Sequence, residues 1–223
     1  HTTADRVSDV CPHCGSVFKT PPKRKLRCPE CKKDVYVRSK QKLFESTLLS
    51  KQDADTSDFY EQLINLGATL EDYKEAEKSL RAKWGFKPNP YDVAWRVSNL
   101  LGVKLSKTAS SKQNLLQSLQ FIAFSQAQYQ LKRGHDPRPY LLGAQDYRID
   151  QLNDRGLGIS LKSVDIITNG CCDECSRYEG KEYSAQHLKK SKLLPIKECT
   201  RKLDKEDKYS WCVCMYSPKY DYN

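Results

Sequence analysis

The cysteines of the sequence are concentrated near its two ends, at spacings typical of metal ligands. The first group is Cys11-Pro-His-Cys14 followed by Cys28-Pro-Glu-Cys31. Each C-x-x-C pair makes a tight turn that directs two thiolates at one point, and two such turns close a tetrahedral site of four sulfurs. This donor set suits zinc, with iron in a rubredoxin-like site as the alternative. We therefore predict a structural zinc ion held by Cys11, Cys14, Cys28 and Cys31.

The residues around these turns predict a small zinc ribbon. Gly15 and Lys32 follow the second cysteine of each turn and are expected to let the chain leave it. The segments Val17-Phe18 and Val35-Tyr36-Val37 have the composition of short strands that pack over the metal. His13 lies inside the first turn, and we expect it to face solvent rather than to bind the ion.

A second group of cysteines follows a Gly170 turn and predicts another zinc site. Its members are Cys171, Cys172, Cys175, Cys199, Cys212 and Cys214. The spacing makes Cys172 and Cys175 a ligand pair, and Cys199 lies in a loop and supplies a third ligand. The fourth ligand is Cys212 or Cys214. If this stretch is a strand, we expect the two side chains to point to opposite faces, so that only one of the two binds the ion.

Cys212 is the preferred fourth ligand, because Trp211 could shield it from water. Cys171 and the unused partner would then be free thiols, and His187 is a minor alternative ligand. None of the cysteines lies between Lys32 and Gly170. Disulfide scaffolds usually spread their cysteines through the chain, so the clustering favours zinc in a reducing compartment, and we expect a cytoplasmic protein with two structural zinc ions.

Positive charge is concentrated in the first 42 residues. They hold eleven Lys and Arg against four Asp and Glu, a balance of +7 out of the +10 of the whole chain. A local concentration of this kind attracts polyanions, so we expect contacts to the phosphates of DNA or RNA. The expected contact residues are Lys19, Lys23, Arg24, Lys25, Arg27, Lys32, Lys33 and Arg38. Phe18 and Tyr36 could add stacking surfaces. The alternative is a ribbon that only stabilises the fold or docks a protein.

Residues 43–159 have the pattern of a helical region. We expect a helix that begins at Ser57-Asp58, a second that runs from Thr69 to Gly85, and a third that begins at Pro90. A fourth should end at Gly134, and Pro137 or Pro139 should open the last one. Trp84 and Trp95 are expected in the core. The region contains no nucleotide-binding glycine loop, H-E-x-x-H motif or nucleophile elbow. A helical spacer or a protein-docking bundle is the expected role.

The C-terminal segment resembles a known module. The pattern Cys172-x-x-Cys175, then Glu179-Gly-Lys-x-Tyr183, Leu194-Pro195, Cys199 and Cys212-Val-Cys214 is similar to the C-terminal cysteine motif of the head-morphogenesis (minor head protein) family of tailed phages. Here Glu179 replaces the usual Asp, and the loop lacks the common His-Pro. The whole arrangement also resembles zinc-ribbon proteins of phages and prophages. The resemblance implies a phage or prophage origin and a zinc-stabilised fold.

These observations predict an α+β, mostly helical protein in three parts. They are a basic zinc ribbon (1–42), a helical region (43–159) and a small zinc-bound β-rich module (160–223). The expected function is non-enzymatic nucleic-acid binding. A phage assembly or host-interaction protein that binds another protein is the alternative, and a zinc-dependent nuclease using Asp173, Glu179 and Lys181 is the third reading. We expect no membrane contact, because no stretch is long and apolar enough to cross a bilayer.

Overall fold

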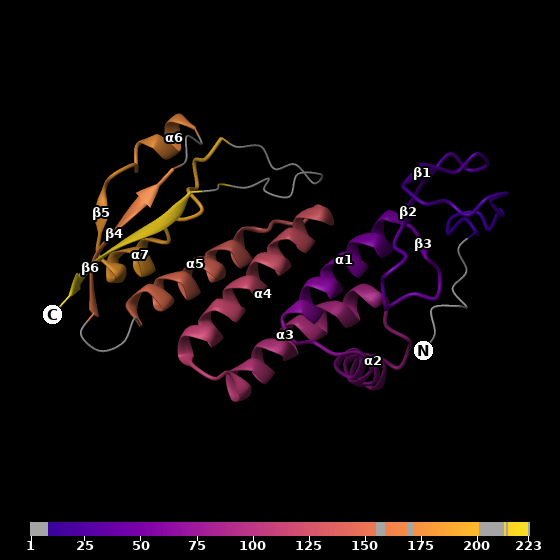
Figure 1. The fold of residues 1–223 in the computed structure, drawn as a ribbon, viewed down its shortest axis with the longest axis horizontal. Helices are drawn as coiled ribbons and strands as arrows, with labels where there is room; N and C mark the ends of the chain where they lie inside the picture. The colour runs from indigo at the N-terminus through magenta and orange to yellow at the C-terminus, as the bar shows by residue number, and fades with distance from the viewer. Residues whose placement is uncertain (1–8, 155–158, 169–171, 201–211, 213, 223) are drawn as a thin grey trace. The chain divides into compact units, whose positions relative to one another are not determined.

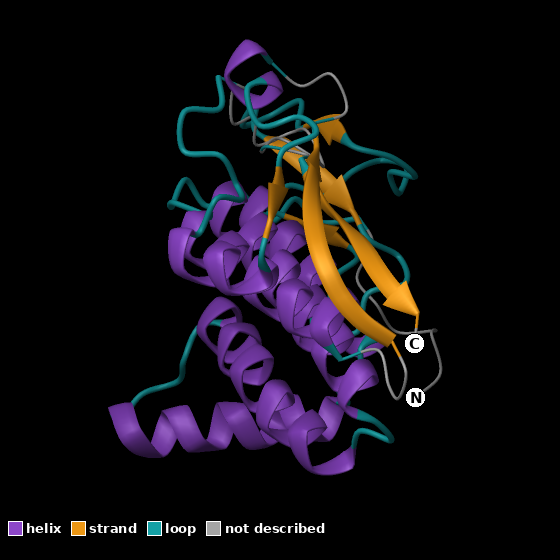
Figure 2. Ribbon diagram, turned by 90° about the vertical axis from the view of Figure 1, so that its left-hand side faces the viewer, coloured by secondary structure: helices purple, strands orange, loops and turns teal. Residues whose placement is uncertain are grey.

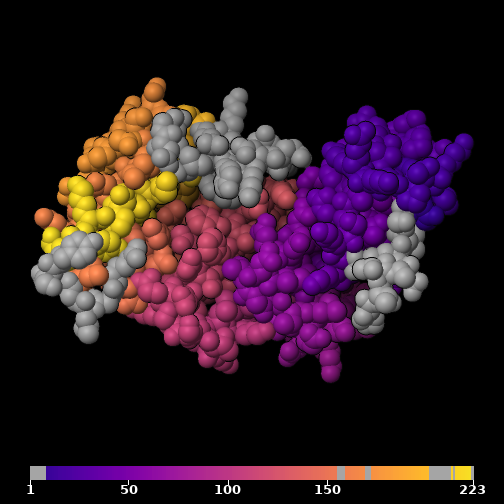
Figure 3. All heavy atoms as spheres, in the orientation of Figure 1, coloured from indigo at the N-terminus to yellow at the C-terminus, as the bar shows by residue number. Residues whose placement is uncertain are grey.

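The computed structural model describes residues 9–154, 159–168, 172–200, 212 and 214–222, and the remainder is grey in Figures 1 and 3. Helices and two small antiparallel sheets make up the described chain, which confirms the α+β class (Figure 2). The chain divides into two compact units, residues 1–101 and residues 102–223. Each unit is taken by itself below, and the expected division into three parts stays a prediction.

The first unit begins with a three-stranded sheet in the order β1-β2-β3. The strands are β1 (Leu26–Arg27), β2 (Asp34–Val37) and β3 (Leu48–Leu49). Val37 of β2 pairs with Leu48 of β3, so the sheet contains residues on both sides of the expected boundary at residue 42. Leu48 and Val35 are fully buried and pack in one cluster with Cys11 and Cys28. The hydrophobic core of this sheet and the first cysteine group are therefore one structure.

Helix α1 (Lys51–Asn65) begins earlier than the sequence predicted. Its N-cap is Ser50, whose hydroxyl accepts a hydrogen bond from the N–H of Asp53, whereas Ser57 is buried inside the helix. Thr56 is tolerated there because its hydroxyl donates to the carbonyl of Gln52 at 2.9 Å. The expected start at Ser57-Asp58 is thus wrong, since burial of the first helical turns outweighs the weak helix propensity of these polar residues.

Helix α2 (Leu70–Trp84) has the ends that the sequence predicted. Thr69 caps its N-terminus in a capping box with Asp72, and Gly85 ends it in the left-handed conformation at φ 76°. Helix α3 (Pro90–Thr108) then follows, opened by Pro90 as expected. Trp84 does not lie in the core: its exposed fraction is 37%. The expectation that Trp84 is a core residue is therefore wrong.

The second unit contains two long helices and the second sheet. Helix α4 (Lys112–Lys132) is capped by Ser111, and α5 (Arg138–Asn153) follows Pro137. The nine-residue strand β4 (Ile159–Ile167) lies between β5 (Glu182–Tyr183) and β6 (Met215–Tyr222), antiparallel to both. Pro218 is tolerated because β6 is an edge strand.

The core of this unit lies between α5 and the sheet. The short helices α6 (Asp173–Ser176) and α7 (Ala185–Ser191) complete it. The buried residues of this cluster are Ile149, Leu152, Val164, Ile166, Cys175, Leu188, Leu194, Ile196, Cys212, Cys214 and Tyr216. Three cysteines of the second group are therefore part of the hydrophobic core. Among the helices that the structure describes, none combines the length and the apolar character needed to cross a bilayer.

Candidate metal centres

The N-terminal cysteine cluster consists of Cys11, Cys14, Cys28 and Cys31. Their four Sγ atoms all lie within 4.8 Å of one another. The Sγ atoms of Cys11 and Cys31 are 3.8 Å apart, and those of Cys14 and Cys28 are 3.9 Å apart. Four sulfurs around a tetrahedral zinc ion, each about 2.3 Å from the metal, are about 3.8 Å from one another. The four residues are free thiols and can hold a metal ion.

The two turns that carry these ligands have the same backbone geometry. The N–H of Gly15 donates to the carbonyl of Cys11, and the N–H of Lys32 donates to the carbonyl of Cys28, both at 3.0 Å. The N–H of each first cysteine donates in turn to the carbonyl five residues later, at 2.9 Å in both turns. Gly15 and Lys32 have φ of 73° and 59°, so both leave the turn through the left-handed region, as expected.

Two thiols of this cluster differ in how readily they ionise. Burial raises the pKa of Cys11 to about 11. The pKa of Cys28 falls to about 6, chiefly because the backbone N–H of Cys31 hydrogen-bonds to its sulfur, with a further contribution from the Ser16 hydroxyl. A metal ion needs all four groups as thiolates. Cys28 is therefore ready to bind at neutral pH, whereas Cys11 depends on the positive charge of the ion to lose its proton.

The C-terminal cysteine cluster consists of Cys172, Cys175, Cys199, Cys212 and Cys214. The sulfurs of Cys172, Cys175 and Cys199 lie within 4.8 Å of one another, and so do those of Cys175, Cys212 and Cys214. Cys175 is fully buried and belongs to both groups, with its Sγ 3.4 Å from that of Cys172 and 3.9 Å from that of Cys212. Five described sulfurs meet here, one more than a tetrahedral ion uses.

The expectation that Cys212 and Cys214 point to opposite faces is wrong. Residues two apart in a strand point to the same face, and both cysteines precede strand β6, which begins at Met215. Both approach Cys175. The Sγ of Cys214 lies 3.9 Å from the carbonyl oxygen of Thr168, to which its thiol donates.

Local structure fixes the remaining ligands of this cluster. Cys172 is the N-cap of α6, and the N–H of Ser176 donates to its carbonyl at 2.9 Å. Hydrogen bonds from the Thr200 and Cys175 backbone N–H groups lower the pKa of Cys172 to about 6. Cys199 follows α7 and its N–H donates to the carbonyl of Ile196. Burial raises the pKa of Cys175, whose ionisation therefore needs a cation nearby.

The minor candidates lie elsewhere. The ring of His187 stacks on Tyr183 with centroids 5.5 Å apart, and the ring of His13 lies 2.9 Å from the carbonyl oxygen of Asp34. Neither histidine belongs to a group of ligand atoms among the residues that the structure covers. Cys171 and Trp211 lie outside the described residues.

Two of the three residues of the nuclease reading make structural contacts. The carboxylate of Glu179 accepts hydrogen bonds from the N–H of Thr168 at 3.1 Å and from its hydroxyl. These hydrogen bonds connect the residue that follows β4 to the turn after α6. Lys181 lies over the ring of Tyr178, 5.7 Å from its centroid. These contacts explain Glu179 and Lys181 without catalysis.

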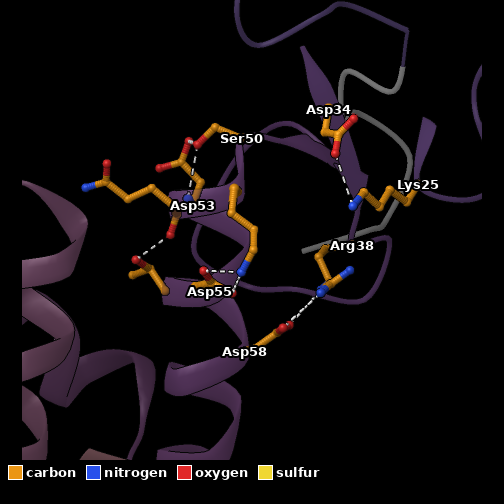
Figure 4. Close-up of polar contacts among 10 residues, drawn as sticks. Lys25, Asp34, Arg38, Ser50, Asp53, Asp55 and Asp58 are labelled. Atoms are coloured by element: carbon orange, nitrogen blue, oxygen red, sulfur yellow. Dashed lines mark hydrogen bonds and ion pairs between the residues drawn. The ribbon is translucent and has the colours of Figure 1, made fainter. Parts of the chain in front are cut away.

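The eight expected phosphate contacts fall into two sets. Three are used in ion pairs. Lys25 lies 3.1 Å from Asp34, and Arg38 pairs with Asp58 (Figure 4). Arg27 lies 3.5 Å from the same Asp34. The other five are exposed and form no ion pair with any described residue: Lys19, Lys23, Arg24, Lys32 and Lys33.

The two aromatic residues expected to stack on bases are also engaged. The ammonium groups of Lys25 and Lys51 lie 4.7 and 5.8 Å from the centroid of the Tyr36 ring, so cations already cover this ring. Phe18 is half-buried and packs against the core around Cys11 and Cys28. Neither ring is a free stacking surface.

Comparisons of the chain with protein-family models, with curated proteins and with solved structures found no match.

Proposed function

We propose that each cysteine cluster holds one structural zinc ion and that the five unpaired cations beside the N-terminal cluster bind the phosphates of DNA or RNA. The protein would act as a binding module rather than as an enzyme. Zinc is favoured because four thiolates in a tetrahedral arrangement suit it best among the common ions. The first cluster with its strands would then be a zinc ribbon.

The five unpaired cations are the observation that carries this proposal. Lys23 and Arg24 lie in the loop between the two cysteine turns, and Lys32 and Lys33 lie just beyond the second turn. All are exposed, and Asp34 is already occupied by Lys25 and Arg27. Cations without a protein partner remain free to replace the counterions of a nucleic acid.

The local charge agrees with a polyanion ligand. Residues 9–40 hold nine Lys and Arg against three Asp and Glu, a balance of +6. A zinc ion with four thiolates contributes −2, which leaves the segment at +4. The ion would be bound by cysteine thiolates alone, so zinc would fix the backbone without occupying the side chains of the cations.

The test removes four of the five unpaired cations and leaves the paired ones. We expect the variant with Lys23, Arg24, Lys32 and Lys33 all changed to Gln to bind DNA and RNA more weakly and to lose roughly 3 units of the slope of log affinity against log salt. The matched control changes Lys107, Lys181, Lys190 and Lys197 to Gln, which removes the same charge outside this segment. Zinc content and far-UV circular dichroism are measured on both variants.

Two results would reject the proposal. One is a parent protein that binds neither DNA nor RNA at low salt, and the other is an equal loss of slope in the control variant. Either result would favour the alternative function, binding to a protein of phage or host. The phage or prophage origin suggested by the C-terminal motif remains a prediction, and the genes that flank this one would test it.

A further inference from the structure

Two aromatic rings stack on each other at the exposed end of α2. The ring centroids of Trp84 and Phe86 are 5.7 Å apart, with 28° between the ring planes. Their exposed fractions are 37% and 63%. Large apolar rings of this kind usually lie in the core, so a stacked pair left in solvent calls for a functional explanation.

Gly85 produces this arrangement. Trp84 is the last residue of α2, and the N–H of Gly85 donates to the carbonyl of Arg81 at 2.9 Å. The φ of 76° at Gly85 reverses the chain so that Phe86 returns beside Trp84. A Cβ at this position would meet nothing within 4 Å, so the positive φ, and not crowding, accounts for a glycine here.

Cations flank the two rings in the sequence. Arg81, Lys83 and Lys87 are exposed, and none forms an ion pair with a residue that the structure describes. Residues 78–87 contain four Lys and Arg and no Asp or Glu. Cations at a helix C-terminus also interact with the helix dipole, but this accounts for Arg81 and Lys83 and not for Lys87, which lies beyond the helix.

We propose that the Trp84–Phe86 pair is a stacking platform for the bases of single-stranded nucleic acid, with Arg81, Lys83 and Lys87 on the phosphates. This inference rests on the proposed function and adds a second contact in the same unit. Aromatic rings among cations are the usual means of binding single strands, because every base has a face that stacks. Duplex bases are already stacked on one another and cannot use the platform.

The exposure of the segment favours a base over an acidic peptide. All seven residues from 81 to 87 are exposed, so both rings lie in a fully exposed segment. A peptide is usually bound in a groove or along a strand edge, where its backbone is partly buried, whereas a base needs only an open ring face.

The experiment compares a short oligothymidylate with a duplex of mixed sequence, by fluorescence anisotropy over a range of salt. In the variant Trp84→Leu with Phe86→Leu, we expect affinity for the single strand to fall about 5- to 150-fold for each base that loses its stack. The salt slope stays unchanged, because stacking releases no counterions, and duplex binding is unaffected. Phe121→Leu is the matched control, since Phe121 is an exposed aromatic residue on α4 with an exposed fraction of 48%.

A second variant tests the cations independently of the rings. Lys83→Gln with Lys87→Gln should reduce the salt slope for the single strand by roughly 1.4 units, at about 0.7 for each phosphate contact. Trp84→Phe should retain most of the affinity, because the ring face remains.

The outcomes separate this inference from the proposed function. Unchanged single-strand affinity in the leucine variant overturns the platform, as does an equal loss for duplex or competition by polyglutamate as effective as by the oligonucleotide. If only the Lys23, Arg24, Lys32 and Lys33 variant loses binding, the platform fails and the proposed function stands. If only the leucine variant loses single-strand affinity, the platform stands and the proposed contact through the ribbon cations fails.

Discussion

Both guanidinium nitrogens of one edge of Arg38 contact both carboxylate oxygens of Asp58. Nε lies 2.6 Å from Oδ1 and Nη2 lies 2.8 Å from Oδ2, and the two side chains are about one-third and one-quarter exposed (Figure 4). The pair joins the residue after β2 to the middle of α1. The hydrogen bonds with Asp58 also raise the pKa of Arg38. A residue expected from sequence to contact phosphate thus connects the first sheet to the first helix.

Arg38→Ala should therefore lower stability rather than nucleic-acid affinity. We expect a loss of about 1 to 2 kcal/mol in the free energy of unfolding, because a partly buried bidentate pair is broken. Arg38→Lys should recover only part of it, since an ammonium group cannot reproduce the paired geometry. Urea unfolding followed by circular dichroism measures both. An unchanged midpoint together with a reduced salt slope would show that Arg38 contacts phosphate instead.

Removal of one ligand should abolish the N-terminal metal site. Cys28→Ser is expected to lose one equivalent of zinc by elemental analysis, because a tetrahedral structural site depends on all four ligands. The sheet of β1, β2 and β3 should unfold, while most of the helical circular dichroism persists. Retention of two equivalents would contradict the proposed ligand set.

The choice between Cys212 and Cys214 can be made with two single variants. We expect Cys212→Ser to lose the C-terminal zinc ion and Cys214→Ser to keep it, because the thiol of Cys214 already donates to Thr168. Alkylation of the zinc-loaded parent under native conditions, read by mass spectrometry, should leave Cys175 unmodified, since it is fully buried. The reverse zinc result would make Cys214 the fourth ligand.

Zinc retention by the N-terminal cluster should depend on pH. The pKa of Cys28 is lowered to about 6 and that of Cys11 is raised to about 11. Above about pH 6, Cys28 is already a thiolate and binds zinc without losing a proton. As the pH falls through about 6, Cys28 takes up a proton, which competes with the ion for its sulfur. Zinc release to a chromophoric chelator should therefore steepen below about pH 6. Release that is independent of pH across this window would contradict this prediction.

Local sequence signals predicted the parts of the structure that depend on local chemistry. Thr69, Gly85 and Pro90 mark the ends of α2 and the start of α3 because capping and fixed φ angles act within a few residues. The start of α1 also has a local signal, the Ser50 cap on the N–H of Asp53, but Ser57-Asp58 offers a competing one in the same stretch. The joint approach of Cys212 and Cys214 to Cys175, by contrast, depends on where β6 begins.

Exposure of single side chains was the least predictable property. Trp84 was expected in the core, but it is the last residue of α2 and its exposed fraction is 37%. The pairing of Arg38 with Asp58, twenty residues away, left no local signal either. The basic composition of the first segment was evident from sequence, whereas the division of its cations into paired and unpaired ones required the structure.

Lys32 combines a left-handed backbone conformation, which suits glycine, with a positively charged side chain. Its counterpart in the first turn is Gly15, for which this conformation costs nothing, whereas a lysine there is strained by roughly 1 to 2 kcal/mol. Glycine would be the better residue for the backbone and lysine is the better residue for an anion. If the proposed function is correct, selection at this position has favoured charge over ease of folding, and Lys32→Gly would give a protein that is more stable and binds less well.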